Sequence, residues 1–378
     1  MSFKYSGLYI VCLFIALCSC EQNKSNTNEF LSIKLGRGLP EIEAKASDLV
    51  SSVQLVKLET VNESLIDYFS YPIYVGEDYI LYYSAKTVIV FDGTGKFIRK
   101  IDQSGEGPKE YTKISSYFYD REKQHIYIVD VDKIQIYTLT GDYVKTLKTG
   151  FQAGGIFIKN PNEFYLPHKQ VYSQGGRKML SVVDSTFETI SDFMSRNPVS
   201  PLEVRQMLFY AGSPYEVDGI IYYKEAFNDT IYQVSDKMIK PVWKVDLQGD
   251  AMTTAEGITP WEPALKKQKI PEIAIRETIR FIFFSYYNVD KKFYSIYDKK
   301  NNSMIFHNEV LYESDLSKLG VPLDLGNFDI DSFWPNFESK DHMLVQIIKP
   351  EDLSDEQLEA IGISGDDNPV LLVAKPKG

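Results

Sequence analysis

The segment Tyr79-Ile80-Leu81-Tyr82-Tyr83 is matched 46 residues further on by His125-Ile126-Tyr127-Ile128-Val129. Each segment is a run of β-branched, aromatic and aliphatic residues of the length of one strand. The same offset relates two further pairs of short segments, 87–91 with 133–137 and 96–99 with 142–145. A repeat of this length, with three or four short strands in each unit, is typical of a β-propeller blade. The repeat therefore predicts an all-β propeller fold.

Carrying this unit along the chain predicts six blades. Tight turns at Asp92–Gly95 and Thr140–Asp142 join strands within the first two, because glycine and aspartate tolerate the positive φ of hairpin turns. The blades are predicted at residues 68–102, 111–148, 154–193, 213–247, 279–314 and 328–374. In the fifth blade, Lys292–Tyr297 is expected as the second strand. In the sixth, strands are expected at Phe328–Trp334, Met343–Ile348 and Val370–Ala374.

The sixth blade lacks a fourth strand in this layout, and the alternating segment Val53–Leu58 has no blade of its own. An open ring would expose unpaired backbone groups at its edges and favour aggregation. We therefore expect residues 53–58 to pair with residues 370–374 as the outer strand of the last blade, which closes the six-bladed ring.

The N-terminal residues have the features of an export signal. Lys4 precedes an unbroken apolar run of ten residues, Leu8–Leu17, which is about half the length of a membrane-spanning helix. The end of this run, Leu17-Cys18-Ser19-Cys20, resembles a bacterial lipobox, which implies that Cys20 is acylated. Residues 1–19 are then a lipoprotein signal peptide, 20–28 a flexible tether and 29–378 the propeller. An ordinary signal peptide cleaved elsewhere is the alternative.

Charge and cysteine content exclude several classes of function. The chain has 41 Lys and Arg against 52 Asp and Glu, a formal net charge of −11, and no run of basic residues. Nucleic acid is therefore not expected as a partner. The three cysteines, at positions 12, 18 and 20, all precede the predicted propeller. The propeller thus has no disulfide and no thiolate metal site.

Three short motifs resemble those of the six-bladed β-propeller lipoproteins of Bacteroides-type bacteria, whose propeller is NHL-like. Gly105–Tyr111 is similar to their Gly-x-Gly-Pro-Gly-Glu-Tyr loop, with Lys109 in place of the third glycine. Asn228–Tyr232 and Asn368–Leu371 are similar to their fourth-blade and last-blade motifs. The resemblance covers roughly residues 50–378. It implies the fold, attachment to the outer membrane as a periplasmic or surface-exposed lipoprotein, and no particular activity or catalytic residue.

The longest insertions are expected on one face of the ring. Connections between blades, and those from second to third strands, open on the same side of a propeller. The long segments are of these two kinds, at 103–112, 195–212, 248–278, 169–177 and 349–369. Loops on a rigid scaffold commonly carry binding residues, although these loops could instead only cap the channel. Two insertions look helical: Ser354–Ile361, with a capping box and Gly362 after it, and Pro271–Arg280.

Aromatic and charged residues on or near this face are the candidate ligand contacts. Aromatic rings beside polar groups suit sugars and peptides, and arginines could pair with an anionic group. Blade packing or the anchoring of a lid is the alternative role for each. The candidates are Glu110, Tyr111, Tyr172, Arg177, Arg205, Trp261 and Trp334.

Catalytic and metal motifs find little support. The four histidines, at positions 125, 168, 307 and 342, lack zinc-site spacing, and there is no Gly-x-Ser-x-Gly elbow. Asp130-Val131-Asp132 suggests Ca²⁺ but lacks the other ligands of a calcium loop. We therefore assign no catalytic residue, metal ligand or cofactor, and leave Ca²⁺ open.

The sequence favours a binding module over an enzyme. We expect an envelope lipoprotein that binds a glycan, a peptide or an envelope protein on the face that bears the insertions, and that meets the membrane through lipid on Cys20. A calcium- or carboxylate-dependent hydrolase or lyase with its site in the central channel is the alternative. A scaffold for a larger envelope complex is a third.

Overall fold

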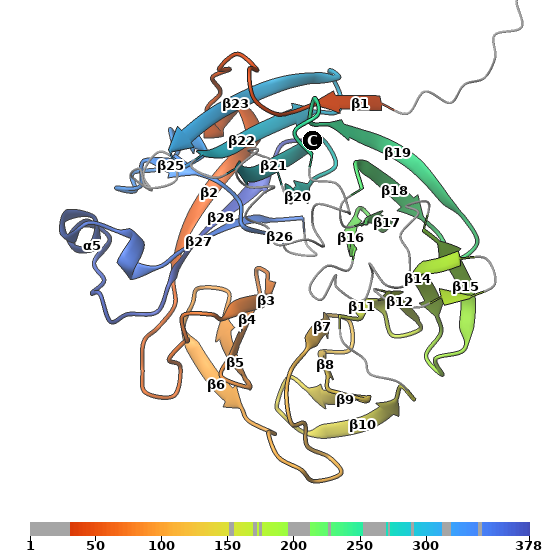
Figure 1. Ribbon diagram of the computed structural model, residues 1–378. Coiled ribbons are helices and arrows are strands. Elements are labelled where there is room, and N and C mark those ends of the chain that lie inside the picture. The colour runs from red at the N-terminus through yellow and green to blue at the C-terminus, as the bar shows by residue number, and fades with distance from the viewer. Residues whose placement is uncertain are drawn as a thin grey trace, which may run out of the picture.

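The computed structural model is a six-bladed β-propeller, in which six small sheets surround a central axis (Figure 1). It describes residues 31–378 apart from segments 151–154, 169–171, 174–175, 196–211, 226–227, 252–269, 271–272, 289–290, 312–318 and 339–341. No helix in this described part of the chain is long and apolar enough to span a membrane.

Blades 1 and 2 are regular four-stranded antiparallel sheets, as the repeat predicts. Blade 1 consists of β3 (Tyr71–Val75), β4 (Tyr79–Ser84), β5 (Thr87–Asp92) and β6 (Phe97–Ile101). Blade 2 consists of β7 (Ser116–Asp120), β8 (His125–Val129), β9 (Lys133–Thr138) and β10 (Tyr143–Lys148). Within each, Gly95 or Gly141 has positive φ in the turn before the outer strand, where a side chain would strain the backbone.

Blades 3 and 4 each carry an additional strand. Blade 3 consists of β11 (Phe157–Asn160), β12 (Glu163–Pro167), β14 (Gly176–Val183) and β15 (Thr189–Met194), and β13 (Tyr172–Ser173) pairs with the start of β14. Blade 4 consists of β16 (Ser213–Val217), β17 (Ile220–Lys224), β18 (Thr230–Val234) and β19 (Ile239–Asp246). The N-terminal strand β1 (Leu31–Lys34) lies parallel to β19 at its outer edge.

Blades 5 and 6 complete the ring. Blade 5 consists of β20 (Ile273–Glu277), β21 (Phe281–Asn288), β22 (Lys291–Asp298) and β23 (Ser303–Leu311). Blade 6 consists of β26 (Phe337–Glu338), β27 (Leu344–Ile348), β28 (Val370–Pro376) and β2 (Val50–Lys57). A two-stranded sheet of β24 (Val321–Pro322) and β25 (Ser332–Phe333) lies between the two blades in sequence.

The predicted closure of the ring is confirmed. β2 is antiparallel to β28, with Val53 opposite Ala374 and Lys57 opposite Val370. An N-terminal strand therefore supplies the outer strand of a blade whose other strands come from the end of the chain. This pairing covers the outer edge of β28, which would otherwise present unpaired backbone groups.

The apolar core divides into one cluster for each junction between neighbouring blades. The six clusters lie between blades 1 and 2, 2 and 3, 3 and 4, 4 and 5, 5 and 6, and 6 and 1. Each is built from side chains on the facing sheets of the two blades. Burial of apolar surface therefore stabilises every junction around the ring, including the one beside the closing strand.

Residues 271–280 were predicted as a helix, and that prediction is wrong. Ile273–Glu277 form β20, the inner strand of blade 5, which pairs with β21 from Ile273 opposite Tyr286 to Glu277 opposite Ile282. The apolar spacing of Ile270, Ile273 and Ile275 fits a helix turn as well as a strand. Pairing with β21 decides between them, because it satisfies the backbone of both strands and buries Ile273.

Two strand positions in blades 5 and 6 also differ from expectation. Lys292–Tyr297 belong to the third strand of blade 5 rather than the second, because β20 occupies the inner position. Residues 328–334 were expected to be the inner strand of blade 6. Its inner strand is instead β26, while Ser332–Phe333 pair with β24.

The predicted helix after β27 is confirmed as α5 (Asp355–Ile361). Ser354 accepts a hydrogen bond from Gln357 at its start, and Gly362 ends it in the left-handed region. Ile361 packs into the core between blades 5 and 6, and Lys57 Nζ donates to the Ile361 carbonyl at 3.2 Å. α5 therefore lies at the rim of blade 6 and not over the ring centre (Figure 1). The short helices α1 (Ala46–Leu49) and η2 (Pro350–Asp352) flank the same blade.

Strand directions define the two faces of the ring. The connections 58–70 and 102–115 between blades, and 349–369 between β27 and β28, lie on one side, which we call the insertion face. Outer strands such as β19 run toward this face. β1 is parallel to β19, so it also runs toward this face, and its first residue, Leu31, pairs with Trp243 near the middle of β19. The described chain therefore begins midway along the outer edge of blade 4 and runs toward the insertion face.

Candidate functional site

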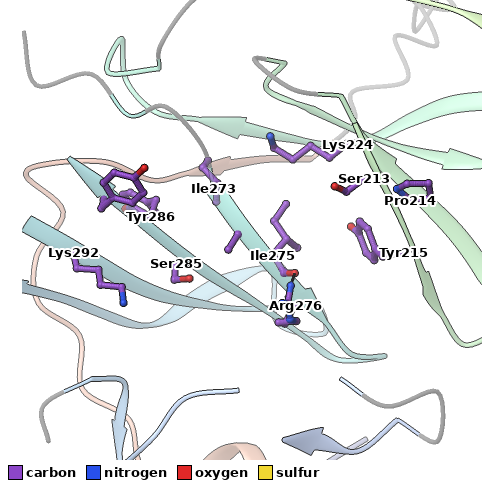
Figure 2. A pocket seen from close by; sticks show the side chains of 12 residues that line it. Ser213, Pro214, Tyr215, Lys224, Ile273, Ile275, Arg276, Ser285, Tyr286 and Lys292 are labelled. Atoms are coloured by element: carbon purple, nitrogen blue, oxygen red, sulfur yellow. Dashed lines mark hydrogen bonds between the residues drawn. The ribbon is translucent and has the colours of Figure 1, made fainter. Parts of the chain in front are cut away.

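A pocket of about 470 Å³ lies at the insertion face between blades 4 and 5. It is formed by the ends of β16, β17, β21 and β22 that lie on this face and by most of the length of β20. Figure 2 shows side chains from both blades around it. The lining includes Tyr215, Lys224, Ile273, Arg276, Tyr286 and Lys292. Its volume is in the range of small-molecule sites in proteins. We call it the blade 4–5 pocket.

A second pocket, of about 300 Å³, lies between blades 5 and 6. Ser285 and Lys292 line both pockets, so the two adjoin across the rim of blade 5. Ser354 and Gln357 at the start of α5 form part of the second lining. The two pockets are therefore neighbours on the insertion face.

The aromatic walls of the blade 4–5 pocket are fixed by hydrogen bonds behind them. Tyr215 stacks on Tyr222 with ring centroids 5.5 Å apart, and its hydroxyl donates to Glu277 Oε2 at 2.7 Å. Glu277 is fully buried and forms a 2.9 Å ion pair with Lys299. Tyr286 accepts a 2.9 Å hydrogen bond from the Gly36 amide, and burial raises the pKa of its hydroxyl. These contacts hold both rings before any ligand arrives.

Three cationic side chains reach the blade 4–5 pocket. Arg276 donates to the carbonyl of Ile275 at 2.8 Å and to that of Asn336 at 3.1 Å. Lys292 is partly buried, which lowers the pKa of its ammonium group, and its Nζ lies 5.5 Å from the centre of the Tyr294 ring. Lys224 is the third. Among the lining residues that the structure describes there is no aspartate or glutamate, so this pocket favours negative charge.

Glu110 and Tyr111 lie in the turn between blades 1 and 2. The Glu110 carboxylate accepts a 2.8 Å hydrogen bond from the Gly107 amide, and so it stabilises the turn. Tyr111 is fully buried and donates to the Lys86 carbonyl at 2.7 Å. Burial raises its pKa to about 12. A surface ligand does not reach this ring, so we do not include Tyr111 in the site.

Trp334 is a core residue whose edge borders the second pocket. Its ring packs edge-on against Tyr294 at 4.7 Å and Phe283 at 5.6 Å between centroids, and only 8% of the residue is exposed. Its main role is thus to pack blade 5 against blade 6. Ligand contact is restricted to the exposed edge.

The remaining candidates are on blade 3 or outside the described residues. Tyr172 and Arg177 are opposite one another in the hairpin of β13 and β14. Arg205 and Trp261 lie outside the described residues. The structure therefore does not bring the sequence-predicted residues together into one site.

Comparison with known proteins places the chain in a family. A family described as "Domain of unknown function (DUF4934)" matches residues 35–375. The chain belongs to this family. No curated protein matches it.

Two solved structures from Bacteroides were compared with the chain. A protein described as exported, from Bacteroides fragilis NCTC 9343, is similar over 92% of this chain and 99% of its own, with 21% identity and a TM-score of 0.68. A protein of unknown function from Bacteroides caccae has 9% identity and a TM-score of 0.40, over 69% and 93% of the two chains. The first of these likenesses supports the six-bladed fold.

Asp130, the suggested calcium ligand, binds the chain itself. Its carboxylate accepts hydrogen bonds from the Thr112 amide and hydroxyl, at 3.0 and 2.9 Å, and from the Lys113 amide at 3.2 Å. Burial alone would raise its pKa, but these hydrogen bonds outweigh burial and lower it. In the described ranges no three His, Cys, Asp or Glu side chains converge as metal ligands.

Two histidines form buried or half-buried pairs with serines. His168 Nε2 lies 2.7 Å from Ser181 Oγ, and His307 Nδ1 lies 2.9 Å from Ser295 Oγ. Burial lowers the pKa of both imidazoles. Both serines are buried, so neither pair presents a nucleophile to solvent.

Sequence reasoning missed the residues that line the blade 4–5 pocket. Lys224 and Lys292 lie at strand ends on the insertion face, and Arg276 lies near the other end of β20, with its guanidinium reaching the Asn336 carbonyl. One sequence feature could have pointed to them. A lysine or arginine near the end of an apolar strand keeps its charge near the surface, where a ligand can reach it. Correct strand order was also needed, because Lys292 reaches this face only as part of a third strand.

A cluster of exposed apolar residues was also missed on the connection from β2 to β3. Leu65, Tyr68, Phe69 and Tyr71 are between 53% and 80% exposed. Lys349 Nζ lies 3.3 Å from the Tyr68 ring centre and donates to its carbonyl at 2.8 Å. The cluster gives the insertion face a second surface suited to contact with another molecule.

Proposed function

We propose that this chain is an envelope lipoprotein that binds a small glycan or peptide in the blade 4–5 pocket. The observation that carries the proposal is the pocket itself. It has the volume of a small-molecule site, two tyrosine walls held by hydrogen bonds behind them, and three cationic residues in its lining. Ligand sites are typically preformed, largely apolar pockets into which a small number of polar groups point.

The place where the chain enters the propeller supports a role on the outward side of an anchored protein. From Leu31, which pairs with Trp243 midway along β19, β1 runs toward the insertion face, so the chain approaches from the direction of the opposite face. The stretch from Cys20 to Leu31 reaches about 40 Å at most. A lipid on Cys20 would then hold the opposite face toward the membrane and direct the pocket away from it.

Replacing Cys20 with serine is expected to release the protein from the membrane fraction, because serine cannot carry the thioether-linked lipid. Fractionation of the expressing Gram-negative cells measures this. Cys18→Ser is the matched control and is expected to leave the protein in the membrane pellet. Membrane retention of Cys20→Ser would show that another feature anchors the chain.

Thermal unfolding of residues 29–378 with a ligand panel tests binding in the pocket. The panel contains digalacturonate, maltose, diglutamate and diglutamine, with Ca²⁺ and EDTA as separate additions. A ligand that binds only the folded state raises the melting temperature by mass action, with about 2.7 kcal/mol at a hundredfold excess over its Kd. We expect at least one disaccharide or dipeptide to do so.

Ala274→Trp is designed to fill the pocket from its exposed inner strand. This variant is expected to abolish the ligand-induced rise in melting temperature. Thr189→Trp, on the outer strand of blade 3, is expected to keep that rise. An equal shift in Ala274→Trp, or none in the wild-type protein, would contradict the proposal. A Ca²⁺ shift that EDTA reverses, without any sugar or peptide shift, would favour the hydrolase alternative.

A further inference from the structure

We infer that the ligand of the blade 4–5 pocket is acidic, with a carboxylate held by Lys292 together with Lys224 and Arg276. This inference rests on the proposed function of the same pocket. It assigns the chemical class of the ligand, which the pocket volume alone does not.

The charge of the pocket is opposite to that of the chain. The protein carries 52 acidic against 41 basic residues, yet the described lining holds Lys224, Arg276 and Lys292 and no acid. Figure 2 shows Lys224 and Arg276 on either side of Ile275, while Lys292 lies on β22, which β21 separates from β20. Cations gathered from three strands at a low-dielectric wall attract an anion more strongly than the same charges on an open surface.

Of the three cations, Lys292 is the one whose ammonium group would be stabilised most by an anionic ligand. In the part of the chain that the structure describes, its Nζ makes no ion pair or hydrogen bond, and its contact is the ring of Tyr294 at 5.5 Å. A partly buried cation without a carboxylate partner is costly. Lys292 and Ser285 line both pockets, and Asp331 and Asp352 line the second one, so a ligand carboxylate is expected on the blade 4–5 side of Lys292.

Arg276 provides the orientation that a lysine cannot. Its guanidinium is fixed by two backbone carbonyls, those of Ile275 and Asn336. A planar guanidinium held in this way presents its donors in a fixed direction, which suits carboxylate geometry. Lys224, at the end of β17, lines the pocket from blade 4 (Figure 2).

The uncharged part of the lining accommodates the body of such a ligand. Ile273 and Tyr286 are apolar walls, and Ser213 and Ser285 offer hydroxyl groups. A uronic acid and an acidic dipeptide share the required chemistry, a carboxylate on a compact body with apolar and polar sides. The experiment has one arm for each source.

Calorimetric titration of residues 29–378 at low salt, with two matched pairs of probes, tests the inference. Digalacturonate is compared with maltose, and diglutamate with diglutamine. We expect one of the acids to bind at least about tenfold more tightly than its neutral partner, since hydrogen bonds to charged groups contribute that much. Lys292→Met is expected to raise the Kd of that acid about tenfold or more.

Two controls separate loss of charge from loss of folding. Lys292→Arg keeps the cation and is expected to retain binding within a few-fold. Lys375→Met removes an exposed lysine near the opposite face and is expected to leave the Kd unchanged.

Other outcomes would overturn the inference. These are a neutral probe that binds as tightly as its acidic partner, an acid whose Kd is unaffected by Lys292→Met, and absence of binding by both acids. A neutral probe whose binding Ala274→Trp abolishes would overturn the acidic ligand but keep the pocket as a binding site. Absence of any shift across the thermal panel would overturn the proposed function itself.

Discussion

Replacing Asn368 with alanine is expected to lower the free energy of unfolding by about 2–4 kcal/mol, because one buried and two partly buried backbone hydrogen bonds lose their side-chain partner. Asn368 is only 3% exposed. Its side-chain amide nitrogen donates to the carbonyls of Glu59 and Ser64 at 3.0 and 2.9 Å. Its Oδ1 accepts a 2.9 Å hydrogen bond from the Ile66 amide. Asn368 thus ties the start of β28 to the connection that leaves the closing strand.

Denaturant unfolding monitored by circular dichroism measures this effect. Asn162→Ala is the matched control, because Asn162 is exposed, and its expected change is within about 0.5 kcal/mol. A loss below 1 kcal/mol in Asn368→Ala would mean that the contacts across the closure contribute little to stability.

Glu277→Ala is expected to cost about 3–5 kcal/mol of stability, because it leaves Lys299 charged and largely buried without its partner. Glu277 is fully buried, and Lys299 has 14% of its side chain exposed. Tyr215 also loses the acceptor that fixes its hydroxyl. The same variant should therefore loosen one wall of the blade 4–5 pocket.

A double-mutant cycle with Lys299→Met gives the measurement. We expect Glu277→Ala/Lys299→Met to recover part of the lost stability, because no buried charge is left unpaired. Glu309→Ala in the same blade is the control. Glu309 pairs with Lys291 at the surface, where both side chains are more than a third exposed, so a change of about 1 kcal/mol or less is expected. If the double variant is less stable than Glu277→Ala, the account of this pair is wrong.

The propeller fold was predictable because several separate features of the sequence indicate it. The offset between Tyr79–Tyr83 and His125–Val129 gave the blade unit, and Val53–Leu58 was recognisable as a strand without a blade. The capping box at Ser354 likewise located α5. These features depend on local chemistry or on simple periodicity, both of which a single sequence retains.

The errors arose where tertiary pairing decides between two local patterns. Residues 273–277 can bury isoleucines as a helix or as a strand, and only the empty inner position beside β21 selects the strand. The inner strand of blade 6 is just Phe337–Glu338, which is too short to be recognised from alternation. Both errors shifted the strand order near the pocket.

The candidate site was less predictable than the fold. Loop length indicated the face on which the described pockets lie, but not the residues that line them. Tyr111 and Trp334 looked accessible in the sequence, yet they pack into blade junctions. Lys292 is informative only once β22 places it beside Ser285 and above Tyr294. The residues that line the pocket come from separate strands, so they form no motif that can be recognised in the sequence.

The most direct test of the account is hydrogen exchange of residues 29–378 with and without the panel compound that gives the largest thermal shift. If the ligand binds in the blade 4–5 pocket, the added protection of backbone amides is expected to concentrate in 213–224 and 273–292, the segments of blades 4 and 5 around the pocket. Protection confined to turns on the opposite face, such as 92–95 and 139–142, would contradict the assignment of the blade 4–5 pocket as the binding site.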